Sequence, residues 1–221
     1  MEPQFWTSRW REGRTGFHQD AVHPDVLNTA AGLLPEAPGR VLIPLAGKST
    51  DIAWFLEQGH QVTAIELSPL AIDAWHQTHN REAVPTPHGD WTCHRSENLD
   101  FWCADILKLD ASGLGPFDLI WDRAALVALD MERRRAYAKR LSAWLAPSGT
   151  LLLNGFEYDQ SKMAGPPHAV WREDLADLFP TLHPTLLREG AWQTEGKFAD
   201  RGVERFRDYL LTLTPSPDFQ P

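Results

Sequence analysis

The sequence predicts an α/β protein built on a mostly parallel central sheet, with helices on both faces. Two successive strand-helix units near the N-terminus indicate this fold, because a strand followed by a helix and a second strand builds a parallel sheet. The length agrees with it, since 221 residues are enough for one substantial core and few for two independent ones. We therefore expect a single domain over residues 1–221.

The two strand-helix units follow from the order of apolar and turn residues. The run RVLIPL at 40–45 predicts a strand, and the polar segment after Gly47 leads into the apolar helix pattern IAWFLEQG. The run QVTAIEL at 61–67 predicts the second strand. Ser68 and Pro69 then form a favourable N-cap and first-turn pair for the next helix.

The later elements are less regular. Residues 80–90 are rich in Pro, His and Gly and predict a loop, and the stretch around 96–98 predicts a hairpin turn. A helix is expected over 131–146, with its arginines on a solvated face. The other expected elements are strands at 117–122, 150–158, 182–188 and 203–213 and a short helix near 171–178.

The composition excludes several classes of function. A net charge of -9 disfavours nucleic-acid partners, whose binding depends on clustered Lys and Arg. No apolar run approaches the length of a membrane span and no signal-peptide pattern is present, so we expect no membrane partner and a cytoplasmic location. Without a heptad pattern, a monomer is expected. Cys93 and Cys103 have no metal-binding or redox spacing and are interpreted as cross-strand neighbours or buried small apolar residues.

A candidate ligand site lies where the first two strands end. In doubly wound sheets a ligand binds outside the carboxyl ends of the strands, and an acidic residue about twenty positions beyond the first turn binds ribose hydroxyls. Glu66 matches that carboxylate. The turn Pro44–Lys48 has one glycine instead of the G-x-G-x-x-G series, which favours a nucleoside without phosphates over a dinucleotide. On the pattern alone, Glu66 could equally face solvent after a buried strand.

Six segments, in order along nearly the whole chain, resemble the signature blocks of thiopurine S-methyltransferases, and the length resembles that of the bacterial members. The resemblance implies a Rossmann-like class I methyltransferase fold with an antiparallel C-terminal strand. It also implies S-adenosyl-L-methionine as methyl donor, S-adenosyl-L-homocysteine as product, and no metal. The segments are F-W-x-x-R-W (5–10), G-R-T-G-F-H (13–18), P-L-A-G-K-S-x-D (44–51), E-L-S-P-L-A-I (66–72), I-W-D-R-A-A-L-V-A-L (120–129) and Y-D-Q-S-K-M-A-G-P-P (158–167).

The resemblance assigns roles position by position. It implies an N-terminal lid over residues 1–35, a ribose contact at Glu66, and a catalytic residue, Arg123, beside cofactor and acceptor. Phe17 and Arg201 are assigned to the acceptor, although Lys197 competes with Arg201 for that position. The implied cofactor contacts are Trp6, Trp10, Phe17, Leu45, Gly47, Glu66, Leu67, Asp105, Ile106 and Arg123.

Each assignment has a structural alternative. The N-terminal aromatic residues could staple onto the core, Asp105 could cap a turn, and Arg123 could form a surface ion pair. Ala46 replaces the cysteine usual in the family's turn and is interpreted as a packing change. His18 is the one acid-base candidate, and a structural role is favoured for it.

The expected reaction is methyl transfer to the sulfur of a small thiol or aromatic thiol. A thiol titrates near about 8.5, so no general base is obligatory. Alternative acceptors are selenium or tellurium species, halide or thiocyanate, and the thiol of a secondary metabolite. A non-catalytic nucleoside-binding regulator and a dinucleotide oxidoreductase are the rivals from other classes, the latter disfavoured by the missing glycines.

Overall fold

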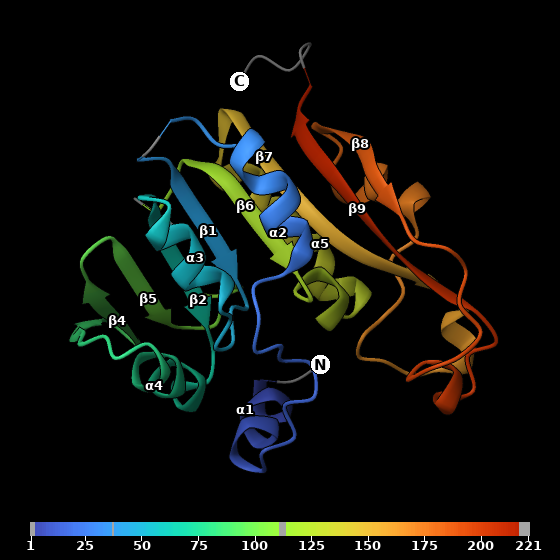
Figure 1. The fold of residues 1–221 in the computed structure, drawn as a ribbon, viewed down its shortest axis with the longest axis horizontal. Coiled ribbons are helices and arrows are strands. Elements are labelled where there is room, and N and C mark those ends of the chain that lie inside the picture. The colour runs from blue at the N-terminus through green and yellow to red at the C-terminus, as the bar shows by residue number, and fades with distance from the viewer. Residues whose placement is uncertain (1–2, 37, 111–113, 217–221) are drawn as a thin grey trace. The chain divides into compact units, whose positions relative to one another are not determined.

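The computed structural model describes residues 3–36, 38–110 and 114–216, and Figure 1 shows the fold as a ribbon. The chain divides into two compact units, of which the first ends at Trp121 and the second begins at Asp122. No helix in these ranges is long and apolar enough to cross a membrane. The single domain and the lid over 1–35 stay predictions.

The first unit contains the predicted parallel strands. The two predicted strand-helix units are present: β1 leads through α3 to β2, and β2 leads into α4. Each of these strands is a short apolar run that ends at turn residues. Strands β5, β2, β1 and β6 are neighbours in that order and pair in parallel. Their bounds are β1 Arg40–Pro44, α3 Asp51–Glu57, β2 Gln61–Glu66, α4 Pro69–Thr78, β5 Leu99–Cys103 and β6 Phe117–Arg123.

An antiparallel ribbon extends this sheet beyond β5. The predicted hairpin turn is present between β4 (Trp91–Ser96) and β5, with Asn98 in the left-handed region at a φ of 59°. The predicted loop at 80–90 is wrong for β3 (Val84–His88), which pairs with β4. Although β3 contains two prolines, it is the edge strand, where a missing N–H costs no ladder hydrogen bond.

The two cysteines lie on neighbouring strands without facing each other. Cys93 lies opposite Trp102, and Cys103 opposite Thr92, so their side chains point to opposite faces of the sheet. Both thiols are free, and Cys93 is fully buried. Of the two sequence interpretations, the buried small apolar residue describes Cys93.

The N-terminal segment of the first unit forms α1 (Pro3–Arg11), α2 (Pro24–Thr29) and the 3-10 helix η1 (Ala30–Gly32). A buried carboxylate attaches this segment to the sheet. Asp51 accepts hydrogen bonds from the backbone N–H of His23 at 2.8 Å and from Nε1 of Trp121 at 2.8 Å. The start of α2 is thereby joined to α3 and β6.

The second unit is antiparallel in the part of the chain that the structure describes. β9 pairs with both β7 and β8, so the expected antiparallel C-terminal strand is present. The 3-10 helices η2 to η5 lie in its connections. The bounds are η2 Leu126–Ala128, α5 Met131–Trp144, β7 Leu145–Tyr158, η3 Gln160–Lys162, η4 Arg172–Asp174, α6 Leu175–Leu178, β8 Leu182–Glu189, η5 Ala199–Arg201 and β9 Phe206–Pro215.

The prediction of a solvated arginine face on α5 is wrong for Arg134, whose exposed fraction is 4%. Arg134 shares one helix face with buried Tyr137, Ala138 and Leu141, at the spacing of three, four and seven residues that places side chains on one side. Its guanidinium donates to the carbonyl oxygens of Leu126 at 3.0 Å and Ala169 at 2.8 Å. These bonds satisfy part of the charged group inside the unit.

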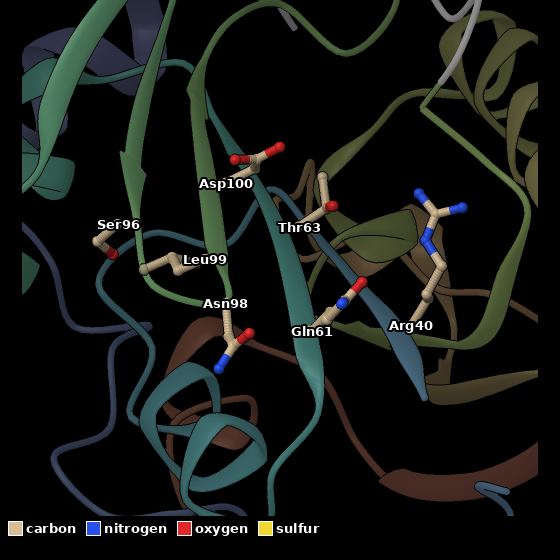
Figure 2. Close-up of a pocket in the computed structure, with 7 residues that line it drawn as sticks. All are labelled: Arg40, Gln61, Thr63, Ser96, Asn98, Leu99 and Asp100. Atoms are coloured by element: carbon tan, nitrogen blue, oxygen red, sulfur yellow. The ribbon is translucent and has the colours of Figure 1, made fainter. Parts of the chain in front are cut away.

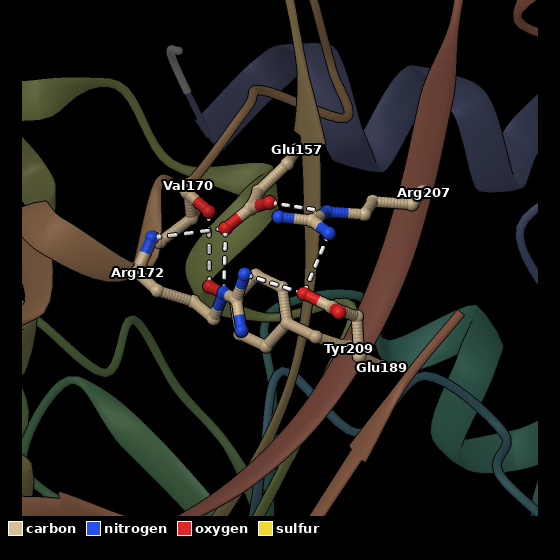
Figure 3. Close-up of polar contacts among 6 residues, drawn as sticks. All are labelled: Glu157, Val170, Arg172, Glu189, Arg207 and Tyr209. Atoms are coloured by element: carbon tan, nitrogen blue, oxygen red, sulfur yellow. Dashed lines mark hydrogen bonds and ion pairs between the residues drawn. The ribbon is translucent and has the colours of Figure 1, made fainter. Parts of the chain in front are cut away.

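An ion network joins the strands of the second unit (Figure 3). Glu157 on β7 is 2% exposed and accepts from Nε of Arg172 at 2.9 Å and from Nε of Arg207 at 2.6 Å. Both arginines also pair with Glu189. Burial alone raises the pKa of Glu157, but the two arginines outweigh it and lower that pKa.

Candidate functional site

The carboxyl ends of β1, β2 and β5 lie side by side, along the side of the first unit's sheet where these parallel strands end. We call this side the carboxyl edge. Pro44 is paired with Ile65, and Glu66 is paired with Cys103, so the three strands end within a residue of one another. The turns that follow them therefore gather at this edge, where ligands bind in sheets of this type. These turns carry Leu45, Gly47, Glu66, Leu67, Asp105 and Ile106.

Glu66 connects two of these turns. Its exposed fraction is 6%, so it does not face solvent. Oε2 accepts from the backbone N–H of Gly47 at 2.9 Å, and Oε1 accepts from that of Ser68 at 2.8 Å. Burial raises the pKa of Glu66, and the backbone hydrogen bonds partly oppose that rise. The carboxylate is therefore held in one orientation before any ligand arrives.

The remaining hydrogen-bonding capacity at Glu66 matches the ribose of a nucleoside. Backbone N–H groups of Gly47, Ser68 and Leu67 all stabilise this carboxylate, and a carboxylate has about four acceptor positions, so acceptor capacity is left for a ribose hydroxyl. Next to it, Oγ of Ser68 is buried and has no hydrogen-bond partner within the described residues. The Glu66 carboxylate and the Ser68 hydroxyl together fit the adenosyl part of S-adenosylmethionine.

The turn after β1 has a strained backbone. Leu45 and Gly47 both lie in the left-handed region, with φ of 48° and 56°. A side chain at Gly47 would bring its Cβ to 3.2 Å from Cζ2 of Trp10, so the glycine permits a close approach there. Ala46 is 7% exposed and its N–H donates to Ile65, which agrees with the packing role expected for it.

The N-terminal aromatic residues form a cluster of their own. The rings of Trp6 and Trp10 each meet Phe17 edge-on, with centroid distances of 5.6 Å and 5.7 Å. No residue of α1 is fully buried, so these rings do not staple into the core. Through Trp10, the cluster instead touches the turn at Gly47. The structure thus brings the predicted lid residues and the predicted cofactor turn together.

Asp105 has the turn-capping role that was its structural alternative. Its Oδ1 accepts from the N–H of Leu107 at 3.0 Å, and its carbonyl accepts from Lys108 and Leu109. Ile106 beside it is 5% exposed. Asp105 therefore holds the shape of the turn after β5, at the edge where the resemblance places the adenine.

Two of the predicted acceptor residues belong to the second unit. Arg123 is the last residue of β6, and Ala124 after it has a positive φ of 60°. Arg201 lies exposed on η5, and its Nη1 donates to the carbonyl of Pro166 at 3.4 Å. Lys197 is exposed as well, and the choice between Lys197 and Arg201 as the family's second basic residue stays a prediction.

A pocket of about 230 Å³ opens at the other edge of the first unit's sheet (Figure 2). Its walls come from the amino ends of β1, β2 and β5, as Figure 2 shows for Arg40, Gln61 and Leu99. The carboxyl-edge turns contribute nothing to it, so this pocket is separate from the candidate cofactor site. Within the described ranges, no three His, Cys, Asp or Glu residues gather in a group able to hold a metal ion.

A family model described as thiopurine S-methyltransferase matches residues 1–216. The chain belongs to the thiopurine S-methyltransferase family. A thiopurine S-methyltransferase of Bordetella petrii is 38% identical over 96% of this chain and 98% of its own length. One of Legionella pneumophila is 41% identical over 78% of each chain.

Solved structures confirm the fold. The 1,6-didemethyltoxoflavin-N1-methyltransferase of Burkholderia thailandensis, crystallised with bound 1,6-didemethyltoxoflavin and S-adenosylhomocysteine, has a TM-score of 0.63 at 23% identity, covering 96% of this chain and 87% of its own. The N-methyltransferase NodS of Bradyrhizobium japonicum has a TM-score of 0.56 at 19% identity, covering 81% and 79%. With the family match, this protein is an S-adenosylmethionine-dependent S-methyltransferase, and the solved structures show that it has the class I fold.

The sequence reasoning missed three buried groups of this methyltransferase. Asp51 holds the N-terminal segment, Asp122 holds the turn after β6, and Arg134 crosses from α5 to two backbone carbonyls. All three contacts join residues distant in sequence or in irregular turns. The one available signal was the helical spacing that aligns Arg134 with apolar residues.

Proposed function

We propose that this methyltransferase acts on the sulfur of a small aromatic thiol and that Glu66 binds the ribose hydroxyls of its methyl donor. The buried carboxylate, which backbone N–H groups hold in one orientation at the carboxyl ends of the strands and which keeps acceptor capacity beyond them, carries this proposal. The names of the relatives support a sulfur acceptor. A monomeric state and a cytoplasmic location stay predictions from the composition.

S-adenosylmethionine, when bound, supplies a methyl group already activated by its sulfonium. The protein then needs to orient donor and acceptor and to exclude water, which together contribute several kcal/mol to lowering the barrier. Glu66 and the turn at Gly47 orient the donor. The aromatic cluster of Trp6, Trp10 and Phe17 touches that turn and is suited to covering it.

On the acceptor side, the resemblance assigns Phe17, Arg123 and Arg201. A guanidinium beside a thiol favours its thiolate, which is the nucleophile, so an arginine replaces a general base. The ring of His18 pairs with exposed Asp20 at 3.0 Å, and a structural role stays the favoured prediction for that histidine.

Calorimetry with S-adenosylmethionine and S-adenosylhomocysteine tests the donor site. Glu66→Gln keeps the size of the side chain and removes its charge, so we expect about 10- to 100-fold weaker binding, because hydrogen bonds to a charged group contribute about 1.5 to 3 kcal/mol. Glu157→Gln is the matched control, since it also changes a buried strand-end glutamate but lies in the second unit. Unchanged affinity in Glu66→Gln, or no binding by the wild type, would contradict the proposal.

A panel of acceptors with product mass spectrometry tests the acceptor class. We expect methylation of aromatic thiols and no product with the matching phenols, because a phenol carries far less anion at neutral pH. Turnover only with halide, thiocyanate, selenium or tellurium species would replace the thiol by that acceptor. Tight donor binding without any turnover would identify a non-catalytic regulator.

A further inference from the structure

The turn that carries Arg123 is closed by a buried acid. Asp122 is fully buried, and its Oδ1 accepts from the backbone N–H of Leu126 at 3.0 Å. Its Oδ2 accepts from the hydroxyl of Tyr137 on α5 at 2.7 Å. Because Ala124 lies in the left-handed region, the backbone turns sharply between the two bonded residues. Arg123 is therefore held between a fixed carboxylate and a fixed amide.

A buried base holds the same turn from the other side. Nε of Arg134 donates to the carbonyl of Leu126 at 3.0 Å, so both backbone groups of Leu126 are bonded to buried charged side chains. Nη1 of Arg134 donates to the carbonyl of Ala169 at 2.8 Å. A backbone hydrogen bond of 2.6 Å from His168 to Val127 adds to this link. The turn is thus tied to the segment 166–170.

The segment 166–170 also contacts the second acceptor arginine. The carbonyl of Pro166 accepts from Arg201, and the carbonyl of Pro167 accepts from the hydroxyl of Tyr158 at 2.6 Å. A hydrogen-bonded path therefore runs from the Arg123 turn through Arg134 to Arg201. This segment overlaps the 158–167 signature block, for which the proposed function has no other use.

We propose that Asp122 and Arg134 are positioning residues for methyl-acceptor binding, which set the turn of Arg123 and, through 166–170, the placement of Arg201. The inference rests on the proposed function, in which those two arginines bind the acceptor. It goes further by assigning the positioning of these arginines to two buried charged residues outside the set of acceptor contacts.

The charge of Asp122 changes in an accessible pH range. Burial raises its pKa to about 6, while the hydrogen bonds from Leu126 and Tyr137 and the charge of Arg134 act against that rise. Tyr209 on β9 also interacts electrostatically with it. Below this pKa, one carboxyl oxygen carries a proton and acts as a donor. The carboxyl group then no longer accepts equally well from both Leu126 and Tyr137. The turn then loosens, and acceptor turnover falls more than donor affinity does.

The test is the pH profile of kcat/KM for a thiol that is ionised throughout, 5-mercapto-2-nitrobenzoate, at saturating S-adenosylmethionine. We expect the wild type to lose activity on the acid side of about pH 6. Asp122→Asn should lack this limb and lower kcat/KM by about 10- to 100-fold. Tyr137→Phe should move the limb to higher pH, because its hydroxyl stabilises the ionised carboxylate.

Two controls separate positioning from general damage. Asp130→Ala removes the N-cap of α5, where the Asp130 carboxylate accepts from the backbone N–H of Arg133 at 3.1 Å. This variant should keep the acid limb of the wild-type kcat/KM profile. Calorimetry should show a much smaller loss of donor affinity than of kcat/KM in Asp122→Asn and Tyr137→Phe, because Arg123 is one of several implied donor contacts and the others lie in the first unit.

A wild-type limb in both Asp122→Asn and Tyr137→Phe, or equal losses in donor affinity, would overturn the inference alone. A wild type that binds the donor but never methylates a thiol would overturn the proposed function and the inference with it.

Discussion

The stability of Asp122→Asn relative to the wild type should rise by about 3 kcal/mol between pH 3.8 and about 6, because the buried charge of Asp122 destabilises the wild type above that interval. The pKa rises from 3.8 to about 6 on folding, which is about 2 pH units. Each unit corresponds to about 1.4 kcal/mol, so the ionised carboxylate destabilises the fold by about 3 kcal/mol relative to its protonated form. Asparagine does not ionise and avoids this destabilisation.

The sign follows from the direction of the shift. A carboxyl whose pKa is raised by folding contributes its stability fully below the unfolded value of 3.8 and loses it as the pH rises through about 6. The free energy of unfolding of Asp122→Asn minus that of the wild type should therefore increase by about 3 kcal/mol across that interval. Above it, the difference should be constant.

The assay is urea denaturation of both proteins at several pH values, followed by tryptophan fluorescence. Subtracting the two curves cancels the other titrating groups, because only position 122 differs. When both proteins also carry Tyr137→Phe, the rise in this difference should extend to higher pH, because the tyrosine hydroxyl no longer stabilises the ionised carboxylate. A difference that is flat, or that falls between pH 3.8 and about 6, would refute the reasoning from burial.

Two further predictions concern glycines that lie against an aromatic ring, one glycine in each unit. Gly47→Ala should weaken donor binding about tenfold, because the left-handed backbone disfavours alanine by about 1 to 2 kcal/mol and the new Cβ meets Trp10. Gly89→Ala has the same kind of backbone at a φ of 59° with no neighbour within 4 Å, so calorimetry should show wild-type affinity; equal losses would contradict a role for the Trp10 contact. Gly155→Ala should destabilise the protein by about 1 to 3 kcal/mol in urea denaturation, since its Cβ would overlap the Tyr209 ring. An unchanged midpoint would show that the ring moves freely.

Much of the parallel sheet could be predicted from the sequence because its strands are continuous apolar runs. The runs at 40–45 and 61–67 match β1 and β2 closely, and the spacing between their turns identified Glu66. β3 was missed because its prolines indicate a loop, and only its place at the sheet edge makes them tolerable.

The buried polar groups could be predicted only where a spacing rule applies. Arg134 was taken for a surface residue because the basic run was judged by composition, whereas its helix face contains Tyr137 and Leu141. Asp122 meets Tyr137 fifteen residues later and Leu126 in an irregular turn. No periodicity predicts such contacts, because they depend on how separate elements pack.

Glu66 and Asp122 show how the same kind of residue at the end of a buried strand acquires different tasks. Burial raises the pKa of both carboxyls, and both accept from backbone N–H groups of the turn that follows. Asp122 also accepts from a tyrosine hydroxyl and is 0% exposed, so its oxygens serve the protein itself. Glu66 is 6% exposed and receives only backbone donors, so acceptor capacity is left on its carboxylate for the proposed ribose contact. The partners of each carboxylate, more than its position in the strand, therefore indicate whether it binds a substrate or positions the residue that does.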